Sequence, residues 1–460
     1  MKKLLVAGPT RLSGTVRIHG AKNSVLPILA ACCLCCSPCV LHNCPDIADV
    51  RTALAILESL GCKARREGST LCIDPTGLDR HCVEPRLAGK MRSSVLFLGA
   101  LLARFSQAEL ALPGGCPLGD RPIDLHVKAL SQLGVRFCFE EGRMRAVWHK
   151  RLDGDIRLPL PSVGATENLL LACALGKRTV NITGAAREPE IADLIGFLRA
   201  AGADISGAGT SSLQICGVSR LHGATYTILP DRIETATYLC MAAGCGGETE
   251  LLRCDARLLL PVIERLREAG CEISADADRI VLRSSGRLLP LLPVSTAPYP
   301  GFPTDAQALL MAAVLKAAGG SEFRETIFER RFLHVPELRK LGADIQVAGS
   351  TARVRGVRQL HGAKLRAEDL RGAAALLTAS MMAEGESELT GLCHLLRGYE
   401  KPEQNLKNLG ASIKSVDIPV QNIDWGHPNM RDGNLKKYNE GKPDFWKKEH
   451  QVKVWANEYE

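Results

Sequence analysis

Apolar residues recur at intervals of three and four along several stretches of the chain, and each stretch ends in a leucine or alanine followed by glycine. This spacing places the apolar side chains on one face of a helix. The clearest stretches carry Ile47, Val50, Leu54, Leu57 and Leu60, and then Ile191, Leu194, Ile195 and Leu198. We therefore predict amphipathic helices there, the second of which begins with the acidic turn Glu188-Pro189-Glu190.

The glycine that ends these helices belongs to a phrase that occurs six times. The six glycines are Gly61, Gly134, Gly202, Gly270, Gly342 and Gly410, at intervals of 73, 68, 68, 72 and 68 residues. Helices often end in the left-handed conformation, which glycine adopts cheaply because it has no Cβ. Short alternating stretches such as 203–206 and 343–347 follow the glycines and predict strands joined by tight turns.

Six mixed units of about 70 residues predict an α/β fold with two similar domains of three units each. Coiled coils, propellers and short solenoids are excluded because their periods are far shorter. The loop before each unit's helix occupies an equivalent place in all six units. Binding and catalytic residues tend to lie on such loops of a rigid scaffold, so we look for chemistry there.

The composition indicates a folded chain. Of its 460 residues, 46% are hydrophobic and 23% are charged, which excludes a wholly disordered chain. No apolar run reaches the roughly 18 residues of a membrane-spanning helix, and the first residues do not form a signal peptide. We therefore expect a cytoplasmic protein whose 18 cysteines stay reduced. The net charge of +8 is compatible with nucleic acid or with phosphorylated small molecules.

Three short segments carry candidate chemistry. Lys22 precedes an apolar helical run, where an ammonium and free backbone N–H groups would suit a phosphate, although a solvated surface lysine is the alternative. Cys116 lies in a glycine-rich loop near Arg121, where its thiol would have a lowered pKa or would simply be a small buried side chain. Asp305 follows a proline-rich turn and would be either a functional acid or the N-cap of a helix starting near Ala306.

Further arginines are candidate ligands for anions, because guanidinium groups bind phosphate and carboxylate bidentately. These arginines are Arg92, Arg121, Arg371 and Arg397. Outside the cysteine-rich run at 32–39 the chain has no further Cys-x-x-Cys pair, and the run has no histidine cluster, so we expect core packing there and no metal site. No Walker A motif, dinucleotide-binding glycine pattern or RNA-recognition signature is present in the sequence.

Many short phrases, in order, resemble those of the enolpyruvyl transferases. They are Gly20-Ala21-Lys22-Asn23, Met91-Arg92-Ser93-Ser94, Pro113-Gly114-Gly115-Cys116, Arg121-Pro122-Ile123-Asp124-Leu125-His126, Ser162-Val163-Gly164-Ala165-Thr166, Ala186-Arg187-Glu188-Pro189-Glu190, Leu229 to Thr235, Thr296 to Asp305, and Arg397-Gly398-Tyr399-Glu400. The resemblance covers residues 1–416 and is strongest to the branch whose acceptor is UDP-N-acetylglucosamine.

The resemblance implies two inside-out α/β domains, each built from three repeated units around buried helices, with the active site in the cleft between them. Residues 22–229 would form one domain, and residues 1–21 with 230–416 would form the other. The implied reaction transfers the enolpyruvyl group of phosphoenolpyruvate to the 3′-hydroxyl of UDP-N-acetylglucosamine and releases phosphate. In the family this is the first committed step of peptidoglycan synthesis, and the enzymes with a cysteine at this place are fosfomycin targets.

The resemblance also implies roles for individual residues. Cys116 would donate a proton and form a covalent adduct with phosphoenolpyruvate, and Asp305 would accept the proton of the sugar hydroxyl. Lys22, Arg121 and Arg397 would hold the phosphate and carboxylate of phosphoenolpyruvate. The implied substrate-binding positions are Lys22, Asn23, Arg92, Arg121, Pro122, Ile123, Asp124, Leu125, Ser162, Val163, Gly164, Asp305, Ile327, Arg371 and Arg397. No metal, organic cofactor, nucleic acid or membrane partner is implied, and the oligomeric state stays open.

The sequence departs from the family pattern at Leu160, where a lysine near the diphosphate is common, and at Asp120, which places an acid beside Arg121. The segment 417–460 lies outside the repeat and holds six of the chain's aromatic residues, so we expect an atypical, partly disordered tail with some contact surface. Three alternatives remain: a transferase acting on shikimate 3-phosphate, an RNA-binding relative, and a non-catalytic paralogue acting as a binding scaffold.

Overall fold

The computed structural model describes residues 2–111, 123–140 and 142–417. Within these residues the buried apolar side chains form two large clusters. One draws on residues between 25 and 228, and the other on residues between 4 and 18 and between 236 and 413. We call the elements around the first cluster the first lobe and those around the second cluster the second lobe. Both clusters belong to one unit, Lys2–Val416.

The first lobe contains three four-stranded sheets, with the orders β14-β3-β5-β4, β6-β7-β9-β8 and β10-β11-β13-β12. Its strands are β3 (Cys39–His42), β4 (Lys63–Glu67), β5 (Thr70–Asp74), β6 (Cys82–Val83), β7 (Gln107–Ala111), β8 (Val135–Glu140), β9 (Arg143–Trp148), β10 (Gly154–Arg157), β11 (Thr179–Thr183), β12 (Asp204–Ser206), β13 (Ser212–Cys216) and β14 (Thr225–Thr227). Its helices are α1 (Lys22–Cys32), α2 (Ala48–Ser59), α3 (Pro85–Ala88), η1 (Arg92–Val95), α4 (Leu96–Phe105), α5 (Asp124–Gln132), α6 (Val163–Cys173) and α7 (Pro189–Ala200).

The second lobe repeats this plan, with the sheet orders β16-β17-β15-β2, β18-β19-β21-β20 and β22-β23-β1-β24. Its strands are β1 (Lys2–Gly8), β2 (Gly14–Arg17), β15 (Gly247–Leu252), β16 (Glu272–Ala275), β17 (Arg279–Ser284), β18 (Val294–Ser295), β19 (Gly320–Arg324), β20 (Asp344–Ala348), β21 (Thr351–Arg355), β22 (Lys364–Arg366), β23 (Gly385–Thr390) and β24 (Ser412–Asp417). Its helices are α8 (Arg232–Cys245), η2 (Ala256–Leu258), α9 (Leu260–Glu268), α10 (Thr304–Ala313), η3 (Val314–Lys316), α11 (Val335–Lys340), α12 (Leu370–Met382), α13 (Leu392–Leu395) and α14 (Pro402–Asn408).

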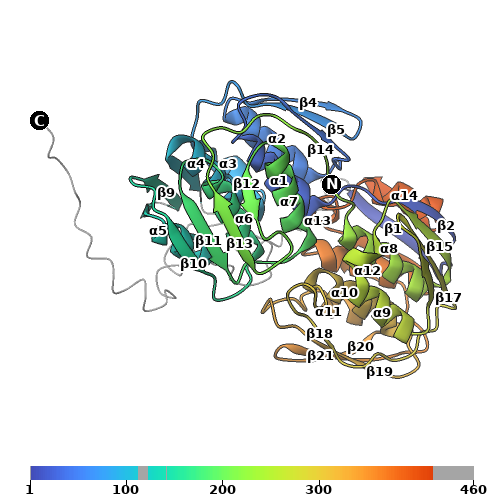
Figure 1. Cartoon of the computed structure of the whole chain (residues 1–460). Helices are drawn as coiled ribbons and strands as arrows, with labels where there is room; N and C mark the ends of the chain where they lie inside the picture. Colours follow the sequence, from blue (N-terminus) through green and yellow to red (C-terminus); the bar gives the residue numbers. More distant parts are fainter. Residues whose placement is uncertain (1, 112–122, 141, 418–460) are drawn as a thin grey trace, which may run out of the picture. The chain divides into compact units, whose positions relative to one another are not determined.

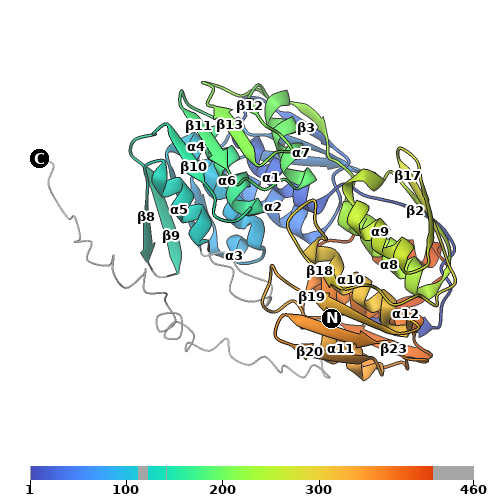
Figure 2. The same cartoon turned by 60° about the horizontal axis from the view of Figure 1, so that its bottom comes forward.

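Each unit places one helix inside and its sheet outside. The inner helices of the second lobe, α8, α10 and α12, contact one another and are buried along nearly their whole length. Figure 1 shows them between strands β15 and β17 on one side and β18 to β21 on another. The first lobe buries α1, α4 and α6 in the same way, while outer helices such as α5 lie against a sheet, here on β8 (Figure 2). This arrangement confirms the predicted inside-out fold.

The six repeat glycines all adopt the left-handed conformation that the sequence predicted. Their φ angles lie between +89° and +106°. At Gly61 an added Cβ would also lie 2.3 Å from the carbonyl oxygen of Gly77, so both the conformation and the close approach require glycine. The predicted amphipathic helices are likewise confirmed as α2 and α7, whose apolar faces are buried.

The chain passes between the lobes twice, and the two passages run side by side. The backbone N–H of Ala21 donates to the carbonyl of Leu229 over 2.8 Å, and the N–H of Asp231 donates to the carbonyl of His19 over 2.8 Å. Strand β14, the last strand before the second passage, pairs with β3 of the first lobe, whereas β1 and β2, before the first passage, belong to sheets of the second lobe. The domain limits 22–229 and 1–21 with 230–416 stay a prediction, which the two apolar clusters support.

The cysteines follow the predicted core packing only in part. All 17 cysteines in the described residues are free, and ten of them are buried, including Cys32, Cys33, Cys35 and Cys39 of the cysteine-rich run. Cys82 in β6, Cys138 in β8 and Cys393 in α13 are exposed, so core packing does not extend to these three cysteines. The described residues contain no cluster of ligands that could hold a metal ion and no helix long and apolar enough to span a membrane.

Candidate active site

Lys22 occupies the start of the first inner helix. It is the first residue of α1, so its expected place at a helix N-terminus is confirmed, and its backbone N–H donates to Asp231 Oδ2 over 3.1 Å. The residues that follow in α1, from Ser24 to Cys32, are all buried, so packing in the core holds the helix although Pro27 removes one of its backbone donors. The ammonium points to a carboxylate of the next helix, Asp49 Oδ2, 2.8 Å away.

Asp49 joins Lys22 to an arginine of the other lobe. Asp49 lies in the first turn of α2, and the Arg397 guanidinium donates to it twice, from Nε to Oδ1 over 2.9 Å and from Nη2 to Oδ2 over 3.2 Å. Burial alone would raise the pKa of Asp49, but Lys22 and Arg397 outweigh that effect and hold the pKa below its ordinary value. Two of the predicted phosphoenolpyruvate ligands are therefore brought together on one ionised carboxylate.

Asp305 is the centre of a second ionic cluster. It receives Arg331 Nη2 on Oδ1 over 2.6 Å and Arg371 Nη2 on Oδ2 over 2.9 Å. Asp305 is the second residue of α10 and makes no capping bond, because Pro303 takes the N-cap position, so the alternative of an N-cap aspartate was wrong. Burial alone would raise its pKa, but Arg371 and Arg331 hold the pKa of Asp305 far below its ordinary value.

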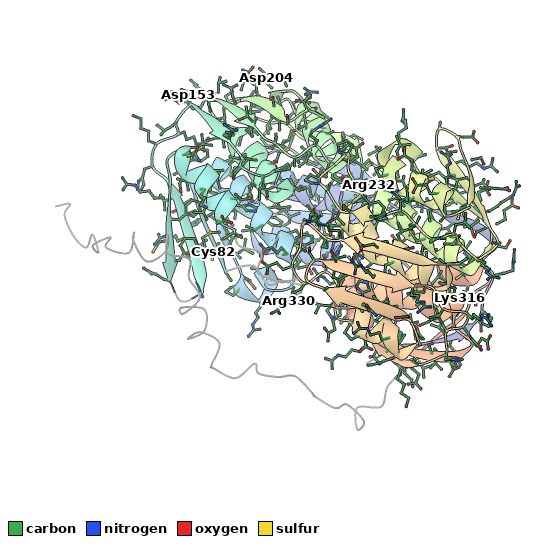
Figure 3. The ribbon with its side chains drawn as sticks, turned by 90° about the horizontal axis from the view of Figure 1, so that it is seen from below. Cys82, Asp153, Asp204, Arg232, Lys316 and Arg330 are labelled. Carbon is green, nitrogen blue, oxygen red and sulfur yellow. The ribbon has the colours of Figure 1, made fainter. Side chains whose placement is uncertain are left out.

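Other residues of the second lobe hold the Arg371 and Arg331 side chains in place. Arg371 follows Asp369, the N-cap of α12, and its Nη1 donates to the hydroxyl of Tyr399 over 3.1 Å. Arg331 is buried and also donates to the carbonyl of Thr304, whereas its neighbour Arg330 is exposed and labelled in Figure 3. Both guanidiniums are thus fixed around the carboxylate of Asp305.

The predicted acceptor-binding segments meet around one buried histidine. Ser162 caps α6 by accepting from the N–H of Ala165 over 3.3 Å, and Gly164 approaches the His126 ring so closely that a Cβ would lie 3.0 Å from Cε1. His126 in turn lies 2.8 Å from the side-chain nitrogen of Asn168. Burial, with a smaller effect of Arg92, lowers the pKa of His126 to about 4, so the ring is neutral and packs without a counter-charge.

The other predicted site residues fall in described and undescribed parts of the chain. Asn23 is the second residue of α1, Arg92 begins η1, Asp124 and Leu125 begin α5 directly after Ile123, and Val163 begins α6. Ile327 is 40% exposed and Leu160 is 64% exposed. Cys116, Asp120, Arg121 and Pro122 lie outside the described residues, so their predicted roles are not addressed by the geometry.

Sequence reasoning did not select Asp49 or Arg331 as site residues. Arg331 lies in a loop before one of the six repeated helices, where we looked for chemistry, so the repeat gave a signal for it. Asp49 gave no signal beyond an acidic residue in the first turn of a helix, which is ordinary there. Its partners lie 27 and 348 residues away in the chain, so only the fold reveals the cluster.

Two further contacts join the lobes beside these clusters. Glu190 in the first turn of α7 accepts a bidentate pair of bonds from Arg232, the first residue of α8, which is labelled in Figure 3. The Arg232 guanidinium also lies 5.6 Å from the ring centroid of Tyr299. The N–H of Tyr299 donates to Glu188 over 3.3 Å. Charged side chains of the two lobes are therefore matched along the same junction as Asp49 and Arg397.

A sequence model described as EPSP synthase (3-phosphoshikimate 1-carboxyvinyltransferase) matches residues 6–406. The chain belongs to the enolpyruvyl transferase family. A UDP-N-acetylglucosamine 1-carboxyvinyltransferase 2 of Caldanaerobacter subterraneus subsp. tengcongensis is 45% identical over 416 residues, which are 90% of this chain and 100% of that relative. The family resemblance seen in the sequence is thereby confirmed.

Solved structures of the enolpyruvyl transferase family have the same fold. The crystal structure of the enolpyruvyl transferase NikO from Streptomyces tendae matches with a TM-score of 0.84 and 28% identity, covering 91% of this chain and 99% of that one. An EPSP synthase from Acinetobacter baumannii matches with a TM-score of 0.70 at 17% identity, covering 91% of this chain and 100% of that one. The second likeness concerns the fold alone.

Proposed function

We propose that this chain transfers the enolpyruvyl group of phosphoenolpyruvate to the 3′-hydroxyl of UDP-N-acetylglucosamine and releases phosphate, the first committed step of peptidoglycan synthesis. The observation that carries the proposal is the set of four cations at the lobe junction. Lys22 and Arg397 meet at Asp49, and Arg331 and Arg371 meet at Asp305. Phosphoenolpyruvate carries a phosphate and a carboxylate, the two anions that such cations bind.

The chemistry requires one proton donor and one proton acceptor. A proton added to the methylene carbon of phosphoenolpyruvate makes the neighbouring carbon electrophilic, and the sugar oxygen then bonds to that carbon. The carbon–oxygen bond to phosphate breaks, and loss of a proton from the new methyl group restores the double bond. We assign the first proton to Cys116 and the acceptor of the hydroxyl proton to Asp305.

The environment of Asp305 is compatible with a base that becomes active only with substrate. Arg371 and Arg331 keep the pKa of Asp305 far below its ordinary value, although its burial acts in the opposite direction. A substrate carboxylate that shares these guanidiniums would neutralise part of their charge and raise the pKa of Asp305 towards the range of an effective base. The acceptor sugar would lie against the segments 123–125 and 162–164, beside Asn23, Arg92 and Ile327.

The decisive experiment is phosphate release from phosphoenolpyruvate with two acceptors. We expect turnover with UDP-N-acetylglucosamine and none above background with shikimate 3-phosphate, because the 45% identical relative is named for the first acceptor whereas the EPSP synthase likeness concerns the fold alone. Phosphate is measured with a coupled colorimetric assay, and the product is identified by mass spectrometry. Turnover with shikimate 3-phosphate alone would favour the sister activity, and turnover with neither would favour a binding scaffold.

A second assay tests the reactive thiol. Incubation with phosphoenolpyruvate is expected to add the mass of one molecule to the wild-type chain, and Cys116→Ser is expected to lose this adduct completely, since a serine hydroxyl is a far weaker nucleophile than a thiolate. Cys82→Ser is the matched control, because Cys82 is an exposed thiol outside the proposed site. An adduct that persists in Cys116→Ser would assign the chemistry to another cysteine.

A cytoplasmic location is part of the same proposal, and the free state of the described cysteines supports it.

A further inference from the structure

Asp49 forms ion pairs with one cation from each lobe. One of its oxygens, Oδ2, lies 2.8 Å from Lys22 Nζ of the first lobe and 3.2 Å from Arg397 Nη2 of the second. The other oxygen accepts from Arg397 Nε over 2.9 Å. The Asp49 side chain is only 3% exposed, so both contacts are made in an environment with little water. Removing one partner of such a buried ion pair costs far more than removing one partner of a surface pair, because the other charge stays buried.

The backbone around Asp49 holds the same two segments together. The N–H of Ala48 donates to the carbonyl of Leu396 over 3.0 Å, and the N–H of Asp46 donates to Glu400 Oε2 over 2.8 Å. The loop that carries Arg397 is therefore docked on the start of α2 by one bond between backbone groups and one bond from a backbone N–H to the Glu400 carboxylate, besides the contact with Asp49. The Asp49 carboxylate also orients Arg397, because the two bonds between them fix the plane of the guanidinium.

Two cations that lie on one oxygen would repel each other if that oxygen were uncharged. Asp49 thus permits Lys22 and Arg397 to lie close together before any anion is bound. We propose that Asp49 is a positioning residue for the proposed reaction: it aligns Lys22 and Arg397 from opposite lobes so that both meet the same substrate anion. This inference rests on the proposed function, because it assumes that these two cations bind phosphoenolpyruvate.

The test is Asp49→Asn, which keeps the shape of the side chain and removes its charge. We expect the KM for phosphoenolpyruvate to rise at least about tenfold and the KM for UDP-N-acetylglucosamine to stay within about twofold, because a displacement of about 1 Å at a binding cation is costly. Steady-state phosphate release gives both constants. Asp46→Asn is the control, since Asp46 precedes the same helix and its side chain pairs with the exposed Arg51.

If Asp49 acted only as a counter-charge, the KM for phosphoenolpyruvate would change in the opposite direction. If Asp49 only reduced the positive potential, removing its charge would tighten anion binding, and the KM for phosphoenolpyruvate would fall. A fall or an unchanged KM in Asp49→Asn therefore overturns the inference. If Asp49→Asn does not fold, Asp49→Glu keeps the charge and displaces it by one methylene, and we expect a smaller rise of the same KM. An unchanged KM in Asp49→Glu would also contradict positioning.

Binding without turnover separates this inference from the proposed function. Calorimetric titration of the wild-type protein with phosphoenolpyruvate measures anion binding whether or not an acceptor is used. If the wild type binds phosphoenolpyruvate but shows no turnover with UDP-N-acetylglucosamine, the proposed function fails while the comparison of Asp49→Asn with Asp46→Asn still tests positioning. Equal dissociation constants for wild type and Asp49→Asn, with normal turnover in both, would overturn positioning alone.

Discussion

Replacing Asp305 with asparagine is expected to lower kcat about 10³-fold, within the range by which a positioned general base accelerates proton transfer. The amide keeps the size of the side chain. Arg331 stays bonded to the carbonyl of Thr304 and Arg371 to the hydroxyl of Tyr399, so the two guanidiniums stay near their present places. The amide cannot accept a proton from the sugar hydroxyl. The KM for phosphoenolpyruvate is expected to change only a few-fold, because none of the four cations is removed.

Steady-state phosphate release across pH measures this effect and its cause. In the free protein the pKa of Asp305 lies far below its ordinary value, so kcat/KM is expected to show no acid limb from this group down to about pH 4. With substrate on the arginines its pKa rises, and an acid limb in kcat is expected at higher pH. Asp344→Asn, an exposed carboxylate at the start of β20, is the control and is expected to match the wild type. A loss of less than tenfold in Asp305→Asn would assign the base to another group.

The fold was predictable because its signal is local and repeated. A helix that ends in a left-handed glycine depends on residues within a dozen positions, and six repetitions make the period visible at Gly61, Gly134 and their counterparts. The inside-out arrangement was implied by the family resemblance, and it agrees with the burial of α8 and α12 along nearly their whole length. The placement of β1, β2 and β14 in the sheets of distant units is not visible in any local pattern.

The candidate site was predictable where a motif carried it and not where two distant segments meet. Lys22, Asp305 and Arg397 were found because they stand in short recognisable phrases. By sequence, Asp49 is an ordinary acidic residue in the first turn of a helix. It becomes a candidate site residue only through its contact with Arg397, which is 348 residues further along the chain. The same reason left both alternatives open for Asp305. An acid after a proline-rich turn caps a helix as often as not, and only Arg331 and Arg371 in space decide the matter.

The junction of the lobes also predicts a large effect on stability. Arg232→Ala is expected to lower the free energy of unfolding by about 3–5 kcal/mol, the usual cost of removing one partner of a buried ion pair. The Arg232 and Glu190 side chains are 8% and 3% exposed, so the remaining carboxylate would be left without water or a counter-charge. Arg232 is also the first residue of α8, where the helix dipole disfavours a cation. Its contribution to the free energy of unfolding therefore comes from the ion pair with Glu190 and not from its own helix.

Urea unfolding of the wild type, Arg232→Ala, Glu190→Ala and the double variant measures the coupling between the two residues. The double variant is expected to be more stable than Arg232→Ala, because it no longer buries an unpaired charge, even though two side chains have been lost. Arg257→Ala is the control: this arginine pairs with Asp255 but is 83% exposed, so its removal is expected to cost at most about 1 kcal/mol. If Arg232→Ala costs no more than Arg257→Ala, the pair is solvated in solution, and the lobes are held together by the backbone passages and the Asp49 cluster instead.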